Sequence, residues 1–160
     1  MTQSRTESRE HGPIVRDIRI DASPEVVFEV VSRPEHVREW WPDDAGFESV
    51  AGALGELVWR NTETGETTTV LMSVVEVDAP RRFSFRWCFK DDDRDSDSLL
   101  VTFDLTPADG GTLLRMTETG WREMGWEVAV LEEHYQDHVD GWNHYIPKLG
   151  EYVARLAATS

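Results

Sequence analysis

The middle of the chain, from Phe47 to Thr119, is a succession of short segments of strand-like composition separated by turn residues. We count six of them: FESVA, ELVWRN, TTVLMSVVEVD, RFSFRWCF, LLVTFDLTP and TLLRMTET. The intervals between them are too short for the crossover that parallel neighbours need, so these strands must pair antiparallel. In RFSFRWCF every second residue is aromatic: Phe83, Phe85, Trp87 and Phe89. One apolar and one polar face predict a sheet that is covered on one side.

A long C-terminal helix is the predicted cover. Apolar and aromatic residues recur there at helical spacing: Leu131, Tyr135, His138, Trp142, Tyr145, Ile146, Leu149, Val153 and Leu156. Pro147 falls inside this pattern, so we expect a kink or a break between Asn143 and Pro147. Gly141, beside Trp142, would let the helix approach its neighbour closely.

Two short helices are expected between the first strand, Ile14 to Ile20, and the sheet segments. In DASPEVVFEVVS, Ser23 is a suitable N-cap and Pro24 suits the first helical position. A second helix begins at Pro34 and ends at Trp41, because a proline disfavours helical geometry in the residue before it.

These elements predict an α+β fold, in which a curved antiparallel sheet of about seven strands wraps round one long C-terminal helix. Residues 14–158 would form a single domain behind a polar, disordered tail of residues 1–13. A curved sheet that grips a helix seldom fills its interior completely. We therefore expect an elongated, mostly apolar pocket between the two.

Several stretches, in this order, resemble a known family: IVRDIRIDASPEVVFEVVSRPEHVREWW, VVEVDAPRRFSFRW, LLVTFDLTPADGGTLLRMTETGW and GWNHYIPKLGEYV. They are similar to the START-like (SRPBCC, helix-grip) superfamily, and within it to the bacterial, AHSA-type relatives of the C-terminal domain of the Hsp90 ATPase activator. The likeness covers roughly residues 14 to 157 and implies the helix-grip fold. It implies no single function, because members include lipid or hormone carriers, polyketide cyclases, ring-hydroxylase subunits and cochaperones.

The charge balance restricts the partners. The chain has 31 acidic and 16 basic residues, a formal net charge of −15. Such a surface repels phosphate backbones and anionic headgroups, so we expect neither nucleic acid nor membrane as a partner. No apolar run has the length of a membrane span, and the N-terminus lacks an apolar signal core, so a cytoplasmic location is expected. The acidic run DDDRDSD, residues 91–97, is expected to be a solvated loop.

Tryptophans are the first candidate site residues, since the chain has seven of them in 160 residues. Trp40 and Trp41 are adjacent and cannot share one face of a helix. One is expected to pack under the sheet edge and the other to border a pocket, although core packing for both is an open alternative. The expected pocket walls come from the strands and the long helix: Trp59, Phe85, Trp87, Met116 and Trp142.

Glu118 and His138 are the candidate polar contacts of this pocket. Strict alternation places Glu118 on the same face as Leu114 and Met116. A carboxylate there is costly unless it is paired, and His138 or Arg86 could supply the partner. Such a pair could orient a polar group of a ligand, or act as acid and base.

No cofactor or metal is expected. His134 and His138 stand four residues apart on the helix, but HExxH is absent and a third ligand is not evident. The single cysteine, Cys88, is expected to be a buried small hydrophobic residue.

The leading hypothesis is therefore a protein that binds a small hydrophobic or aromatic molecule without catalysis of its own. One alternative is a cyclase-like or hydrolase-like enzyme that uses His138 and Glu118. Another is a co-chaperone-like interaction module that docks through its acidic face. Two copies could pair through a sheet edge or the helix surface.

Overall fold

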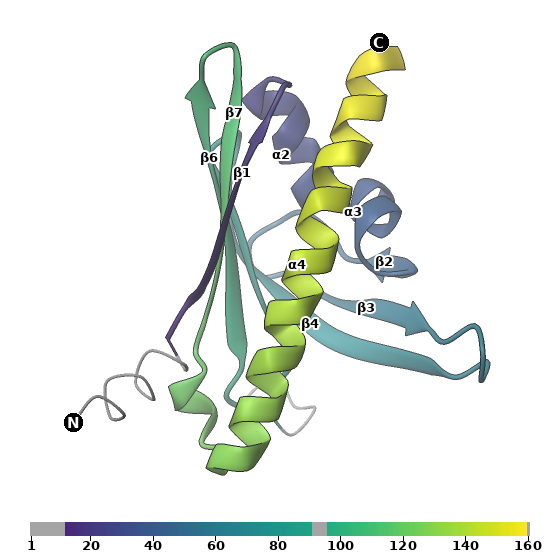
Figure 1. Ribbon diagram of the computed structural model, residues 1–160, viewed down its shortest axis with the longest axis vertical. Coiled ribbons are helices and arrows are strands. Elements are labelled where there is room, and N and C mark those ends of the chain that lie inside the picture. Colours follow the sequence, from purple (N-terminus) through teal and green to yellow (C-terminus); the bar gives the residue numbers. More distant parts are fainter. Residues whose placement is uncertain (1–11, 91–95, 160) are drawn as a thin grey trace.

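A seven-stranded antiparallel sheet curves around the C-terminal helix in the computed structural model (Figure 1), which describes residues 12–90 and 96–159. The strands are β1 (Ile14–Ile20), β2 (Asp44–Gly46), β3 (Leu54–Arg60), β4 (Thr67–Asp78), β5 (Arg82–Trp87), β6 (Leu99–Ala108) and β7 (Gly111–Thr119). Their order is β1-β7-β6-β5-β4-β3-β2, so the first strand pairs with the last. The predicted helix-grip architecture is confirmed. The expected tail lies outside the described residues, apart from Gly12 and Pro13.

The helices are α2 (Pro24–Ser32), α3 (Pro34–Trp40), the 3-10 turn η1 (Arg122–Met124) and α4 (Val128–Thr159). The start of α2 is as predicted, because the Ser23 hydroxyl accepts a hydrogen bond from the Val26 N–H at 3.3 Å. Both α2 and α3 contact α4, and α2 also contacts β5, β6 and β7. These short helices therefore help α4 to cover the inner face of the sheet (Figure 1).

One strand was misplaced by the sequence pattern. The segment FESVA is not a strand, and β2 instead covers Asp44–Gly46, paired with Val58 to Glu56 of β3. The chain then crosses over β3 at Gly55, where a Cβ atom would collide with the Gly46 carbonyl oxygen. Phe47 is carried over the sheet edge by this crossing and stacks on Phe83 with ring centroids 6.2 Å apart.

Helix α4 continues through Pro147 without the expected break. Asn143 and Pro147 are both exposed, so water can reach the Asn143 carbonyl that Pro147 leaves without a donor. The expectation for Gly141 was also wrong, because nothing lies within 4 Å of a Cβ atom built there. The close approach occurs at Gly150, where such an atom would be 2.9 Å from Ile18 Cδ1 of β1. None of the described helices is long and apolar enough to cross a membrane.

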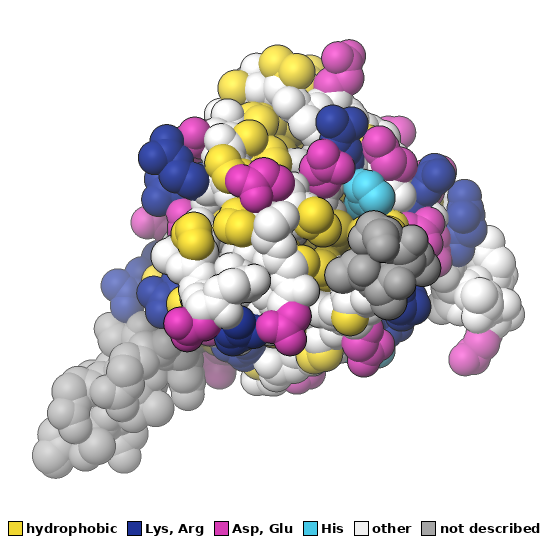
Figure 2. All heavy atoms as spheres, turned by 90° about the horizontal axis from the view of Figure 1, so that it is seen from above, with side chains coloured by type: hydrophobic (Ala, Val, Ile, Leu, Met, Phe, Trp, Pro, Cys, Tyr) yellow, Lys and Arg dark blue, Asp and Glu magenta, His cyan; other side chains and the backbone are white. Residues whose placement is uncertain are grey.

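The end of the molecule where α4 finishes carries charges of both signs (Figure 2). Acidic and basic side chains are interspersed there with apolar ones. The excess negative charge is therefore not gathered into one uniform field on this face.

Candidate functional site

Glu118 on β7 is a carboxylate in the interior of the molecule. Its side chain is 0% exposed, like those of Leu114 and Met116 on the same face of the strand. Alternation along β7 therefore brings a charged residue into a position that an apolar residue would ordinarily occupy. A buried carboxylate of this kind needs hydrogen-bond donors to offset its desolvation.

Three side chains from two elements donate to Glu118. The Trp87 indole N–H of β5 lies 2.8 Å from Oε2, and the Trp142 indole N–H of α4 lies 2.9 Å from Oε1. His138 Nδ1, one turn before Trp142, lies 2.9 Å from Oε1 and 3.0 Å from Oε2. Indole nitrogens can only donate, so both oxygens act as acceptors and Nδ1 carries the hydrogen that it shares with them.

His138 is the member of this group that reaches the surface, with its side chain 16% exposed. Its Nε2 has no hydrogen-bond partner within residues 12–90 and 96–159. Glu118 therefore holds one ring nitrogen and leaves the other available. That arrangement suits a group that accepts or exchanges a proton with a bound molecule.

Cys88 lies close enough to Glu118 to be influenced by its charge. Burial raises the pKa of the Cys88 thiol well above its ordinary value, and the negative charge of Glu118 raises it further. A thiol held in its neutral form is a poor nucleophile. Cys88 therefore lies beside the site but is not a reactive group.

Trp41 stands at the centre of the aromatic rings that surround this network. Its indole lies against five other rings, at centroid distances of 4.9 to 5.8 Å: Trp40, Trp59, Phe85, Trp87 and Trp142. Trp40 and Trp41 are both buried, at 2% and 7% exposure, and their rings stack. This arrangement agrees with the alternative of core packing for both residues. Trp41 caps α3 with φ −125° and ψ −90°, so it has left helical geometry and turns inward beside Trp40.

Among the described residues, these side chains fill much of the space in which the ligand-sized pocket was expected. One cavity between α3 and the sheet measures about 10 Å³ and is lined by residues such as Trp40, Trp41 and Phe85. A cavity of roughly this size holds at most a single water molecule. The expected walls Trp59, Phe85, Trp87, Met116 and Trp142 are all present on the inner face, but Trp41 occupies the space between several of them.

Trp121 forms a further wall beside His138. Its ring lies 4.9 Å from the imidazole in an edge-to-face arrangement, and the side chain is 1% exposed. The Trp121 indole N–H is buried without a hydrogen-bond partner among the described residues. Trp121 follows the last strand, where neither strand nor helix periodicity applies, so its contact with His138 did not follow from the sequence pattern.

The two histidines of α4 do not converge on a metal site. The His134 ring lies 4.6 Å from that of Trp126, whereas His138 faces Glu118. No group of three or more side chains suited to hold a metal ion occurs in the part of the chain that the structure describes.

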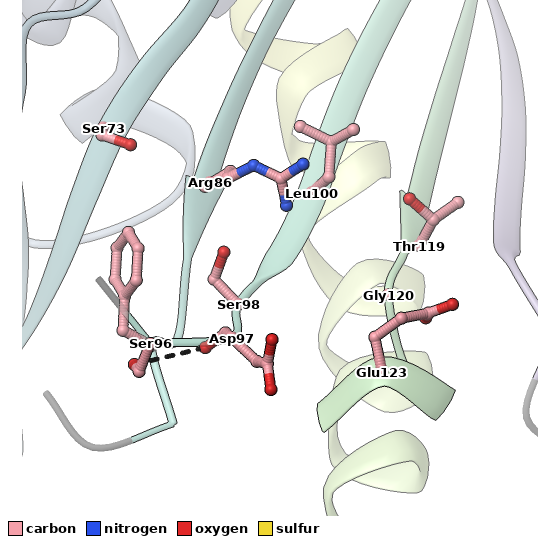
Figure 3. Close-up of a pocket in the computed structure, with 10 residues that line it drawn as sticks. Ser73, Arg86, Ser96, Asp97, Ser98, Leu100, Thr119, Gly120 and Glu123 are labelled. Carbon is pink, nitrogen blue, oxygen red and sulfur yellow. Dashed lines mark hydrogen bonds between the residues drawn. The ribbon is translucent and has the colours of Figure 1, made fainter. Parts of the chain in front are cut away.

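Arg86, proposed above as a partner of Glu118, lies on the opposite face of the sheet. It lines an open hollow of about 630 Å³ on the outer face, together with Ser73, Leu100 and Thr119 (Figure 3). Phe89 lines the same hollow instead of the inner face, because Cys88 has φ +55° and turns the chain over after β5. The expectation that Phe89 continues the inner aromatic row was therefore wrong.

The curved sheet, the long helix and the polar centre between them define a protein of the helix-grip class. The chain belongs to the family described as Activator of Hsp90 ATPase homolog 1-like protein, whose model matches residues 21–154. A search of curated proteins finds no match.

Solved structures with the same fold come from several bacteria. Protein MLL2253 from Mesorhizobium loti is 24% identical with a TM-score of 0.72, and the match covers 89% of this chain and 97% of that one. Protein NE0264 from Nitrosomonas europaea is 16% identical with a TM-score of 0.74, covering 91% and 96%. Protein Ms6760 from Mycobacterium smegmatis is 18% identical with a TM-score of 0.65, covering 94% of each chain. At these identities the likeness concerns the fold.

Proposed function

We propose that this protein binds a small, flat hydrophobic or aromatic molecule between the sheet and α4, and that it acts by binding rather than by catalysis. The observation that carries the proposal is the fully buried Glu118 carboxylate with its two indole donors and His138. Replacing a buried polar network with apolar residues is often neutral or stabilising. The Glu118 network therefore costs folding free energy, and its member His138 reaches the surface. Binding of a ligand explains why the chain has such a network.

The aromatic rings around Trp41 supply the apolar part of such a site. Trp41 occupies a slot between Trp59, Trp87 and Trp142 that accepts a planar ring system. It lies between the short elements α3 and β2. Its backbone N–H donates to the Val37 carbonyl oxygen at 3.0 Å, but its side chain makes no hydrogen bond to the residues that the structure describes. A ligand can therefore take its place by moving this connection, while the longer strands β3 to β7 stay paired. Proteins of this fold family are commonly ligand-binding.

A catalytic role is the second candidate, and the free Nε2 of His138 is the observation that favours it. An enzyme of the cyclase or hydrolase type would use His138 as the base and Glu118 to orient it. The His138→Ala variant separates the two candidates. A binding protein keeps weakened affinity for its ligand, whereas an enzyme loses turnover by orders of magnitude.

Native mass spectrometry of the freshly purified protein, combined with a thermal-shift screen, tests the binding proposal. We expect a flavonoid or an aromatic polyketide to raise the melting temperature by about 5–10 °C at a concentration near 100 times its Kd. The Trp59→Ala variant should lose this stabilisation, because Trp59 is a half-buried wall of the slot. Trp126→Ala is the matched control, since the Trp126 ring contacts Trp121 and His134 and none of the rings around Trp41. An empty protein that no planar compound stabilises contradicts the proposal.

A further inference from the structure

We infer that the molecule bound here is a planar phenol or enol, whose acidic hydroxyl meets Nε2 of His138. This inference rests on the proposed function and specifies the ligand class of the same site. It follows from which hydrogen-bonding groups around Glu118 are already used and which remain free.

Glu118 itself is not the group that a ligand contacts. Each of its oxygens accepts one indole N–H, and both lie within 3.0 Å of His138 Nδ1. Its side chain is 0% exposed. The carboxylate therefore acts on a ligand through the imidazole, by fixing the ring orientation and the position of its Nδ1 hydrogen.

His138 offers the complementary atom. With the Nδ1 hydrogen directed at Glu118, a neutral imidazole presents a lone pair on Nε2, and an O–H donor is its match. If the proton moves from the ligand oxygen to Nε2, the O–H bond breaks and an N–H bond forms. The products are a phenolate or enolate and an imidazolium that is paired with Glu118. An acidic hydroxyl matches the site in both states, whereas an ether or a ketone, which can only accept a hydrogen bond, matches the imidazolium alone.

The surroundings of His138 fit the rest of such a molecule. Trp87 joins the imidazole to the slot of Trp41, because its ring lies 5.3 Å from His138 and 4.9 Å from Trp41. A flat ring in that slot would therefore lie one aromatic ring away from the imidazole. On another side, the buried N–H of Trp121 lacks an acceptor among the described residues, and an anionic oxygen at Nε2 is an acceptor of the kind it lacks. Besides His138, the titratable groups placed here among the described residues are Glu118 of β7, the neutral thiol of Cys88 and Tyr135 of α4, whose ring lies 5.1 Å from that of Trp121.

Two probes that differ by one methyl group test the inference: 4-nitrophenol, and 4-nitroanisole, in which the hydroxyl is methylated. We expect the full chain to bind the phenol about 10-fold to 100-fold more tightly, as for a hydrogen bond that involves a charged group. Binding is followed by quenching of tryptophan fluorescence. At a pH where the free probe is protonated, the visible absorbance of bound nitrophenolate reports the proton transfer.

The variants separate this inference from the proposed function. His138→Phe should bring the affinities of the two probes together, and Trp121→Phe, which keeps an aromatic ring but no N–H, should weaken the nitrophenolate band while leaving nitroanisole binding unchanged. Equal binding of both probes to the unmodified chain overturns the inference and leaves the proposed function intact. A preference for the phenol that survives in folded His138→Phe also overturns it. If neither probe nor any larger planar compound binds, the proposed function fails as well.

Discussion

Replacing Glu118 with alanine is expected to lower the free energy of unfolding by about 3–5 kcal/mol. The change removes the common acceptor of Trp87, Trp142 and His138, which leaves two buried indole N–H groups without a partner. It also leaves a cavity where the side chain was completely buried. Urea denaturation monitored by tryptophan fluorescence measures the loss.

Two further variants at glutamate positions serve as controls for this prediction. Glu118→Gln keeps the shape and one acceptor oxygen but turns an NH₂ group toward a donor, so its loss should fall between the wild type and Glu118→Ala. Glu132→Ala, on the exposed side of α4, should change stability by no more than about 0.5 kcal/mol. A Glu118→Ala protein as stable as Glu132→Ala would show that water replaces the carboxylate, and that the network is open to solvent.

Replacing Trp41 with alanine is expected to cost about 3–5 kcal/mol of unfolding free energy. Trp41 is the ring that fills the space between α3, β3, β5 and α4, in contact with five other aromatic rings. The vacated slot should bind free indole, which would raise the melting temperature of the variant more than that of the wild type. Differential scanning calorimetry with and without indole measures both effects.

Trp126→Ala provides the matched comparison for Trp41. Trp126 is half-buried and lies outside the central group of rings, so its loss should cost less and should not be restored by indole. A Trp41→Ala protein that is as stable as Trp126→Ala, and that indole does not stabilise, would mean that the side chain does not fill a slot of its own.

Much of the fold was accessible from the sequence because its signals are local. The cap at Ser23, the alternation in β5 to β7 and the helical spacing of α4 each depend on neighbouring residues, and these features appear in the structure. The inward direction of Glu118 followed from the same alternation. The pairing of Glu118 with His138 rather than Arg86 could also be predicted, because alternation along β5 places Arg86 on the outer face of the sheet with Ser84.

How side chains fill the interior between the sheet and α4 could not be predicted from local sequence signals. A face assignment for Trp41 assumes regular geometry, and Trp41 is the residue at which α3 ends. Similarly, the left-handed conformation of Cys88 reverses the alternation that placed Phe89 inside. The position of β2 depends on contact between Gly46 and Gly55, which are nine residues apart in the chain. Each of these outcomes is decided by packing between segments rather than by composition within one.

The most direct test of the central claim is a two-dimensional ¹H–¹⁵N NMR spectrum of the tryptophan indole groups, recorded while a flavonoid is added to the wild-type protein. The seven indole N–H signals can be assigned by single Trp→Phe substitutions. Binding between the sheet and α4 predicts that the signals of Trp41, Trp87 and Trp142 move together as the ligand is added, while that of Trp126 stays in place. Saturable binding that moves only the Trp126 signal, or none of the seven, would contradict it and place the ligand site elsewhere.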